Sequence, residues 1–224
     1  MSAIVCADAL TWINGLADES VELCLTDPPY NIGVAHWDKR EDHAEWLLRH
    51  LIAVHPKLTS DGSLVFFAGL GRHGDHPIFR IVSGLERYYT FRNWITWKKR
   101  RAYGKKQDYL YVREEILWFS KGPNVRFNIP LLDEKRGYSG FNPKYPAKSE
   151  YKRVGNVWTD IPELMRPKRV CQKPLPLVER LVLTHSNAGD LVIDPFAGTG
   201  VTIEAALKHG RRANGCDADP QLFA

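Results

Sequence analysis

The short stretch Asp27-Pro-Pro-Tyr-Asn follows an apolar run and places a carboxylate beside two prolines and an aromatic ring. Each proline has its φ fixed at about −65° and donates no backbone hydrogen bond, so the carbonyls of Pro28 and Pro29 remain as rigid acceptors. Together with Asp27 they suit an exocyclic amine on a flat ring such as adenine or cytosine, with the ring stacked on Tyr30. Such acceptors would stabilise positive charge that develops on the amine nitrogen in the transition state. The alternative is an ordinary strand end followed by a proline turn.

A second candidate loop is Asp194-Pro-Phe-Ala-Gly-Thr-Gly, which also follows an apolar run. Gly198 and Gly200 permit a tight strand-to-helix turn that a ligand can approach closely. The spacing is not a dinucleotide fingerprint, because Ile203 replaces the third glycine, and this disfavours a dehydrogenase. Asp217 ends the next predicted strand about 20 residues further on, where an acid can accept hydrogen bonds from a ribose. The loop and the acid together predict a nucleoside-containing ligand that needs no phosphate.

Short apolar segments alternate with helical patterns, which predicts an α/β sheet with right-handed crossovers and helices on both faces. Apolar residues at intervals of three and four predict a helix over 41–55, and Pro174 suits the first turn of another, while 202–209 forms a third. Asp61-Gly62 is expected to turn the chain into a strand. The predicted strands are Ala3–Cys6, Val21–Thr26, Ser63–Ala68, Phe91–Trp97, Val112–Ser120, Leu191–Asp194 and Arg212–Asp217.

The composition fits one globular domain: of 224 residues, 44% are hydrophobic and 25% are charged. No apolar run reaches membrane-spanning length, so a cytoplasmic location is expected. The four cysteines are far apart, which favours reduced thiols over a disulfide or zinc framework. His73, Asp75 and His76 indicate a polar loop rather than a metal site, and no metal is expected.

Positive charge is concentrated in one part of the chain. Residues 98–173 hold 19 Lys and Arg against 8 Asp and Glu, a balance of +11, whereas the rest holds 12 against 18, a balance of −6. A basic segment in an acidic body suggests a polyanion partner on one side, although charge alone favours a solvated loop. Residues 121–169 are too long and polar for an ordinary connection and carry several aromatics, which favours a functional insertion.

These motifs, in this order, resemble the permuted β class of DNA amino-methyltransferases that use S-adenosylmethionine, found in bacteria and phages. The similarity extends to S-D-G-S-L-V-F-F, N-W-I-T-W-K-K, R-E-E-I-L-W-F-S-K-G and C-Q-K-P-L-P-L-V-E-R-L-V. It covers nearly everything outside 124–169. The resemblance implies a seven-stranded, mostly parallel, circularly permuted Rossmann-like sheet. It also implies a catalytic domain over 1–123 and 170–224, with a small basic target-recognition insertion over 124–169.

The resemblance also implies roles for individual residues. The flipped target base would be engaged by Asp27, Pro28, Pro29 and Tyr30. The cofactor would be held by Asp8 at its adenine, by Asp217 at its ribose, and at its methionine part by Lys173, Asp194, Phe196, Gly198, Thr199 and Gly200. Asp8 also fits a turn, and Lys173 a surface cation. Candidate phosphate contacts in DNA, which a solvated charge run would also explain, are Lys98, Lys99, Arg100, Arg101, Lys105 and Lys106.

Three functional alternatives follow. Adenine N6 is favoured as the target because cytosine-N4 relatives more often begin the D-P-P-Y motif with serine, but cytosine stays open. A non-catalytic DNA-binding partner subunit is disfavoured, because a binding module needs neither intact loop.

The family usually continues into a further helix after Gln221-Leu-Phe-Ala, so an apolar edge near Phe223 is expected to be covered by a second subunit, giving a homodimer, or by residues beyond this sequence. A companion restriction endonuclease is a further expected partner.

Overall fold

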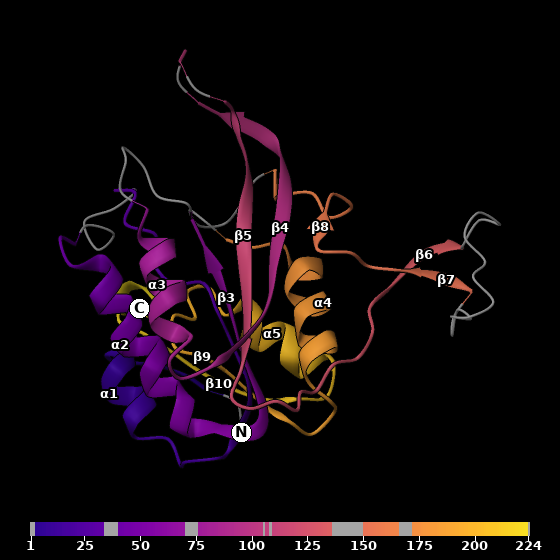
Figure 1. Ribbon diagram of the computed structural model, residues 1–224. Coiled ribbons are helices and arrows are strands. Elements are labelled where there is room, and N and C mark those ends of the chain that lie inside the picture. Colours follow the sequence, from indigo (N-terminus) through magenta and orange to yellow (C-terminus); the bar gives the residue numbers. More distant parts are fainter. Residues whose placement is uncertain are drawn as a thin grey trace.

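The computed structural model describes residues 3–33, 40–69, 76–104, 106–107, 109–135, 150–165 and 172–223. Strands and helices alternate along most of that length (Figure 1). The strands are β1 (Ala3–Cys6), β2 (Val21–Thr26), β3 (Leu58–Ala68), β4 (Thr90–Tyr103), β5 (Tyr111–Ser120), β6 (Leu131–Lys135), β7 (Tyr151–Arg153), β8 (Val157–Trp158), β9 (Leu191–Asp194) and β10 (Arg212–Asp217). The α-helices are α1 (Ala9–Asn14), α2 (His43–Val54), α3 (Pro77–Leu85), α4 (Leu175–His185) and α5 (Val201–Lys208), with 3₁₀-helices at His55–Lys57 and Pro220–Leu222.

Within the described ranges, eight strands form one sheet in the order β1-β10-β9-β2-β3-β5-β4-β8. Neighbouring strands are parallel, except that β5 runs antiparallel to both β3 and β4. All seven predicted strands belong to this sheet, and the two-residue strand β8 adds an eighth beside β4. The prediction of a mostly parallel α/β sheet is confirmed.

Helices cover both faces of the sheet, with α1, α2 and α3 on one side and α4 and α5 on the other (Figure 1). Strand β3 shows how one apolar run serves two cores. Its Leu64 and Phe66 side chains belong to the cluster under α2 and α3, and those of Val65 and Phe67 belong to the cluster under α4. Successive side chains of a strand point to opposite faces, so a strand covered on both sides is apolar throughout.

The helices predicted at 41–55, from Pro174 and at 202–209 form as α2, α4 and α5, but two strands are longer than predicted. Strand β3 begins at Leu58, so Asp61 and Gly62 lie inside it, where a register shift against β2 accommodates them. The prediction of a turn at these two residues was wrong because strand pairing provides partners that the local pattern does not show. Strand β4 likewise continues past Trp97 to Tyr103.

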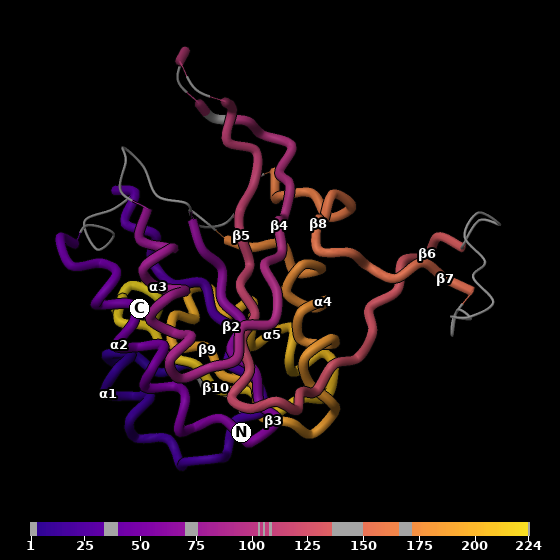
Figure 2. The backbone as a smooth tube through the Cα atoms, in the orientation of Figure 1, coloured from indigo at the N-terminus to yellow at the C-terminus, as the bar shows by residue number. Residues whose placement is uncertain are grey.

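The extension of β4 makes a long hairpin with β5, in which Lys98 pairs with Arg113 and Tyr103 with Tyr111. The charged run that begins at Lys98 lacks apolar alternation, so the sequence did not predict it as a strand. It forms because antiparallel pairing satisfies the backbone beyond the helical layers, where charged side chains remain in water. Figure 2 shows this hairpin and the β6–β7 arm as two separate projections from the body.

The predicted insertion over 124–169 divides into parts that pack on the body and a part that projects. Phe127 stacks on Trp118 of β5 with ring centroids 5.1 Å apart. Further on, β8 pairs with β4, and Trp158 is 4% exposed beneath the guanidinium of Arg180. Between them the β6–β7 arm extends away from the sheet (Figure 1). Residues 136–149 and 166–169 of the insertion lie outside the described residues.

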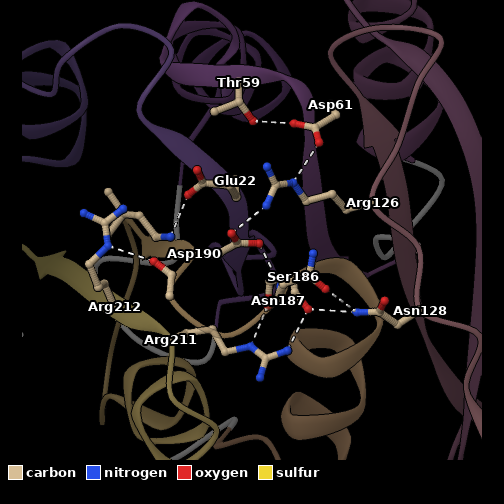
Figure 3. Close-up of polar contacts among 12 residues, drawn as sticks. Glu22, Thr59, Asp61, Arg126, Asn128, Ser186, Asn187, Asp190, Arg211 and Arg212 are labelled. Atoms are coloured by element: carbon tan, nitrogen blue, oxygen red, sulfur yellow. Dashed lines mark hydrogen bonds and ion pairs between the residues drawn. The ribbon is translucent and has the colours of Figure 1, made fainter.

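A polar network holds the start of the insertion to the body (Figure 3). Arg126 donates to the carboxylate of Asp61 on β3 at 2.8 Å and to that of Asp190 before β9 at 2.5 Å. Asn128 donates to the carbonyls of Leu183 and Ser186 near the end of α4, both at 2.9 Å. Because these bonds tie the insertion to both β3 and α4, the point where the arm leaves the body is fixed.

Candidate active site

The two chemistry-bearing loops meet where the strand order of the sheet reverses. Strands β2 and β9 are adjacent and parallel, with Cys24 paired to Ile193, yet the chain continues from them to opposite sides of the sheet. Ligands of open α/β sheets bind at the carboxyl ends of strands at such a point. The Thr26 hydroxyl donates to the Asp194 carboxylate at 2.6 Å and joins the ends of the two strands directly. Loops 168 positions apart in the chain thereby meet at one edge of the sheet.

Both carboxylate oxygens of Asp27 have protein partners. The Tyr30 hydroxyl donates to Oδ1 at 2.7 Å, and the Lys173 ammonium donates to Oδ2 at 2.5 Å. The Asp27 side chain nevertheless keeps 25% of its surface exposed. Burial raises the pKa of Asp27, and the nearby Glu114 charge raises it further, while Lys173 and Tyr30 act in the opposite direction. The carboxylate is therefore oriented by its neighbours and still reachable from outside.

Two residues that the sequence analysis left without a role shape this loop. Asn31 adopts a left-handed φ of 59°, and its side-chain amide exchanges hydrogen bonds with the Arg40 backbone at 2.7 and 2.8 Å. Gly69, just after β3, lies against the Tyr30 ring, because a Cβ at this position would come within 3.1 Å of that ring. The only sequence signals for them were an asparagine after the motif and a glycine after a strand.

Lys173 lies at the D-P-P-Y loop, although it was predicted at the methionine part of the cofactor. Its side chain is 4% exposed and bridges Asp27 and Glu114 of β5, whose Oε2 is 3.4 Å from the ammonium. The sequence analysis missed Glu114, which is one of three adjacent charged residues, Arg113 to Glu115, in β5 and has no distinguishing signal of its own. Burial would raise the pKa of Glu114, but the charges of Lys173 and Lys99 lower it overall.

The glycine loop is organised around the buried Asp194 carboxylate. Besides Thr26, the Phe196 backbone N–H donates to it at 3.0 Å. The pKa of Asp194 is raised to about 6, mainly by burial and to a smaller extent by the charge of Asp27. Hydrogen bonds from Thr26 and Thr202 act in the opposite direction, because they favour the charged form. Asp194 is only 3% exposed, so it shapes the loop from beneath rather than facing a ligand. Thr199 is exposed on the loop.

The two glycines of the loop differ in their surroundings. Both have left-handed backbones, with φ of 51° at Gly198 and 81° at Gly200. A Cβ at Gly200 would lie 2.6 Å from the Ile4 side chain, whereas a Cβ at Gly198 would meet nothing within 4 Å. Gly200 is thus favoured at the start of α5 by its left-handed backbone, and any side chain there would also displace the end of Ile4. Gly198 borders open space on the side where the cofactor is expected.

The acids predicted for the cofactor's nucleoside follow two neighbouring strands. Asp217 ends β10, and its Oδ2 accepts from the Gly198 N–H at 2.8 Å, so it is tied to the glycine loop. Asp8 follows β1 and caps α1, where one oxygen accepts from both the backbone and the hydroxyl of Thr11 at 2.9 and 2.7 Å. These hydrogen bonds lower the pKa of Asp8. Both the capping role and the predicted adenine contact remain compatible with this position.

Aromatic residues that the sequence analysis missed lie beside the glycine loop. The Phe196 ring contacts the rings of Trp46 and His50 on α2, with centroid distances of 5.5 and 5.6 Å. Burial lowers the pKa of His50, which favours its neutral form. Trp46 and His50 lie on a helix whose pattern predicts an ordinary buried face, so only the folded chain distinguishes them from core residues.

The predicted DNA-binding residues are not equivalent. Lys98, Arg100 and Arg101 are exposed on the β4 extension, where Glu163 accepts from the backbone N–H groups of both arginines at 2.8 Å. Lys106 is exposed near the hairpin end, and Lys105 lies outside the described residues. Lys99 differs from its neighbours, because its ammonium contacts the Glu114 carboxylate and its side chain is only 24% exposed.

The described part of the chain offers neither a metal cluster nor a membrane span. No group of three or more His, Cys, Asp or Glu side chains suited to a metal occurs in it, and His73 and Asp75 lie outside it. In the same ranges, no helix has both the length and the apolar character needed to cross a bilayer.

Comparisons with known proteins agree with the geometry. The profile of the family described as DNA methylase matches residues 21–224. The Type II methyltransferase M1.MboII of Moraxella bovis is 31% identical over 94% of this chain and 89% of its own length, and the DNA adenine methyltransferase YhdJ of Escherichia coli is 29% identical over 98% and 79%. The structure of TTHA0409 of Thermus thermophilus, complexed with S-adenosyl-L-methionine, is 29% identical, covers 100% of this chain and 90% of its own, and superposes with a TM-score of 0.72. The chain therefore belongs to the DNA methylase family, as the order of its D-P-P-Y and glycine-loop motifs implied.

Proposed function

We propose that this protein transfers a methyl group from S-adenosylmethionine to the N6 amine of an adenine flipped out of DNA. The observation that carries the proposal is the meeting of the two loops at the strand reversal. It sets the partly exposed carboxylate of Asp27 beside the glycine loop, with the Thr26–Asp194 hydrogen bond between them. The name of YhdJ supports adenine as the target, and the Asp that begins the D-P-P-Y motif supports it independently.

The residues at and around the glycine loop fit the cofactor. Gly198 leaves open space where the methionine part would lie, and Asp217 stands at the end of β10 for the ribose. Asp8 and the Phe196–Trp46 contact border the end where the adenine of the cofactor would bind. S-adenosylmethionine, when bound, supplies an electrophilic methyl group on a sulfonium sulfur.

Asp27 acts on the target amine. The amine lone pair of adenine is delocalised into the ring, so the nitrogen is a weak nucleophile. Hydrogen bonds from this NH₂ group to Asp27 and to the Pro28 carbonyl favour the tetrahedral nitrogen and the positive charge that it acquires. The nitrogen forms its bond to the methyl carbon as the carbon–sulfur bond breaks with both electrons left on sulfur. One proton then leaves the nitrogen through Asp27 to water.

The β4–β5 hairpin is proposed to contact the DNA backbone near the D-P-P-Y loop. Strand β4 runs parallel to β2, and the pairing places Trp94 level with Thr26, so the nine further residues to Tyr103 extend about 30 Å beyond the edge that carries Asp27. Lys98 and Arg100 are exposed along that extension. The arm within 124–169 is proposed to read the sequence, which is the target-recognition role predicted for that region.

Removing hairpin charges is expected to weaken DNA binding in a salt-dependent way. In Lys98→Gln/Arg100→Gln, the plot of log affinity against log salt should become shallower by about 2, because each lost phosphate contact removes about 0.9 from the slope. Fluorescence anisotropy with a short duplex at several KCl concentrations measures it. The matched control is Arg87→Gln/Lys208→Gln, which removes two positive charges after α3 and at the end of α5, near the opposite edge of the sheet. Equal slopes for the two variants would contradict the proposal.

The identity of the target base is tested by product analysis. Duplex DNA treated with the protein and labelled S-adenosylmethionine is digested to nucleosides, and N6-methyladenine is expected as the labelled base. Labelled N4-methylcytosine would overturn the adenine assignment but would still agree with methyl transfer to an exocyclic amine at Asp27. Absence of any transfer, together with no heat of S-adenosylmethionine binding in calorimetry, would favour a non-catalytic partner subunit.

The cellular setting is proposed on the same basis. A DNA substrate in a bacterium or phage-infected cell places the activity in the cytoplasm. A homodimer and a companion restriction endonuclease remain predictions from the resemblance, and size-exclusion chromatography with light scattering would test the first.

A further inference from the structure

Four charged side chains form a continuous chain from the D-P-P-Y loop to the root of the hairpin. Asp27 is paired with Lys173 at 2.5 Å, Lys173 with Glu114 at 3.4 Å, and Glu114 with Lys99. Their exposures decrease toward the centre, with 25% for the Asp27 side chain, 14% for that of Glu114 and 4% for that of Lys173. The family assignment and the resemblance place no role on Glu114.

The register of the sheet explains why these groups meet. Glu114 pairs with Trp97, three residues beyond Trp94, which is level with Thr26 at the end of β2. Glu114 therefore lies at the same edge as Asp27, and its side chain shares a face with Ile116 and α4. Lys173 enters from the segment that leads into α4 and comes between the two carboxylates.

The Lys173 ammonium is confined on its other sides by aromatic rings. It lies 5.3 Å from the centre of the Tyr30 ring and 4.9 Å from that of Phe67. Rings at these distances stabilise a cation and leave little room for it to turn toward water. A buried ammonium shared between two carboxylates is a costly arrangement to build, because each charge must be removed from water. Such an arrangement at a catalytic carboxylate indicates a functional role.

We propose that Lys173 is a positioning residue that holds Asp27 as an oriented carboxylate, and that Glu114 tunes this hold by drawing the same ammonium toward β5. The inference rests on the proposed function, in which Asp27 accepts a hydrogen bond from the target amine. One Asp27 oxygen accepts from Tyr30 and the other from Lys173, so each oxygen keeps acceptor capacity, and the side chain remains 25% exposed. Lys173 thus acts through Asp27 and not on the base itself.

The proposal requires opposite effects from the two partners of Asp27. In Lys173→Met, burial and the Glu114 charge, which both favour the protonated form of Asp27, would be opposed only by the Tyr30 hydrogen bond among the groups that act on it. The pKa of Asp27 should then rise. In Glu114→Gln, a like charge is lost and Lys173 is no longer shared with the Glu114 carboxylate, so the pKa of Asp27 should fall. The other groups that face Asp27, Tyr30 and Asp194, are unchanged in both variants.

The test is the pH dependence of single-turnover methyl transfer, between pH 4 and 9, with Lys173→Arg as the charge-preserving control. The acid limb, where Asp27 becomes protonated, should move up by about 1 to 3 pH units in Lys173→Met and down in Glu114→Gln. It should stay near that of the parent in Lys173→Arg. Shifts in the same direction, or equal loss of rate at every pH, would overturn the proposal.

A second measurement separates this proposal from the proposed function. The pKa of Asp27 is read directly from the ¹³C signal of its carboxyl carbon, assigned by its loss in Asp27→Asn, and needs no activity. If the two variants shift the Asp27 pKa in opposite directions but the parent protein transfers no methyl group, the positioning role of Lys173 and Glu114 is supported and the proposed reaction is contradicted. An unmoved Asp27 pKa, with S-adenosylmethionine binding weakened in Lys173→Met, would return Lys173 to the cofactor site. Glu114→Gln keeps the side-chain shape, so it decides the matter even where Lys173→Met does not fold.

Discussion

Asp27→Asn is expected to lower the rate of methyl transfer by a factor of about 10² to 10³ while S-adenosylmethionine binding stays within about threefold. The amide has nearly the shape of the carboxylate but carries no charge to stabilise the positive nitrogen of the transition state. Loss of one group from a preorganised site of this kind typically costs that factor. Single-turnover kinetics with labelled cofactor give the rate, and calorimetry gives the affinity.

Asp61→Asn is the matched control. Asp61 lies on β3 near the opposite edge of the sheet, where it accepts from Arg126, and Arg126 retains Asp190 when Asp61 is changed. The control should lose no transfer rate. If Asp27→Asn transferred methyl groups as fast as this control, charge at Asp27 would have no part in the reaction, and the proposed chemistry would fail.

Gly200→Ala is expected to destabilise the fold by about 2 to 5 kcal/mol. A left-handed backbone costs a residue with a Cβ about 1 to 2 kcal/mol, and overpacking costs about 1 to 3 more. The second part arises because the new Cβ would lie 2.6 Å from Ile4 Cδ1. Chemical denaturation of the variant and its parent measures the difference in free energy of unfolding.

Two further variants isolate the cause. Ile4→Val removes the clashing methyl group, so it should restore about 1 kcal/mol or more to Gly200→Ala, although alone it should cost about 0.5 to 1.5 kcal/mol. Gly198→Ala has the left-handed backbone without the clash. It should therefore cost less stability but weaken S-adenosylmethionine binding about tenfold or more, because its Cβ enters the open space. If Gly198→Ala bound the cofactor normally, that space would not be the cofactor site.

Much of the fold could be predicted from local patterns. The seven strands and three of the helices were predictable because apolar periodicity reports directly on which residues must be buried. The β4 extension over Lys98–Tyr103 and strand β8 were not, because their backbone partners lie elsewhere in the chain and their side chains show no alternation. Strand pairing satisfies such segments without leaving a signal in their own sequence.

The candidate site divides in the same way. D-P-P-Y and the glycine loop are recognisable because proline, glycine and a strand-ending acid impose their conformations locally, and their order is enough to indicate the family. No comparable local signal identifies Glu114, Gly69 or Trp46, since a residue of each type is ordinary in a strand, a turn or a helix, respectively.

The sequence by itself determined which groups can do chemistry here, namely a rigid carboxylate at Asp27 and a glycine turn at 198–200, because these conformations depend on neighbouring residues alone. Only the tertiary structure decided which charge faces which. Sheet register brought Glu114 level with Asp27, and the segment before α4 placed Lys173 between them. The pairing also set Lys99, one of the predicted DNA contacts, against the largely buried carboxylate of Glu114. Coulomb interactions depend on distance in space and on burial, and neither is contained in the spacing of residues along a chain.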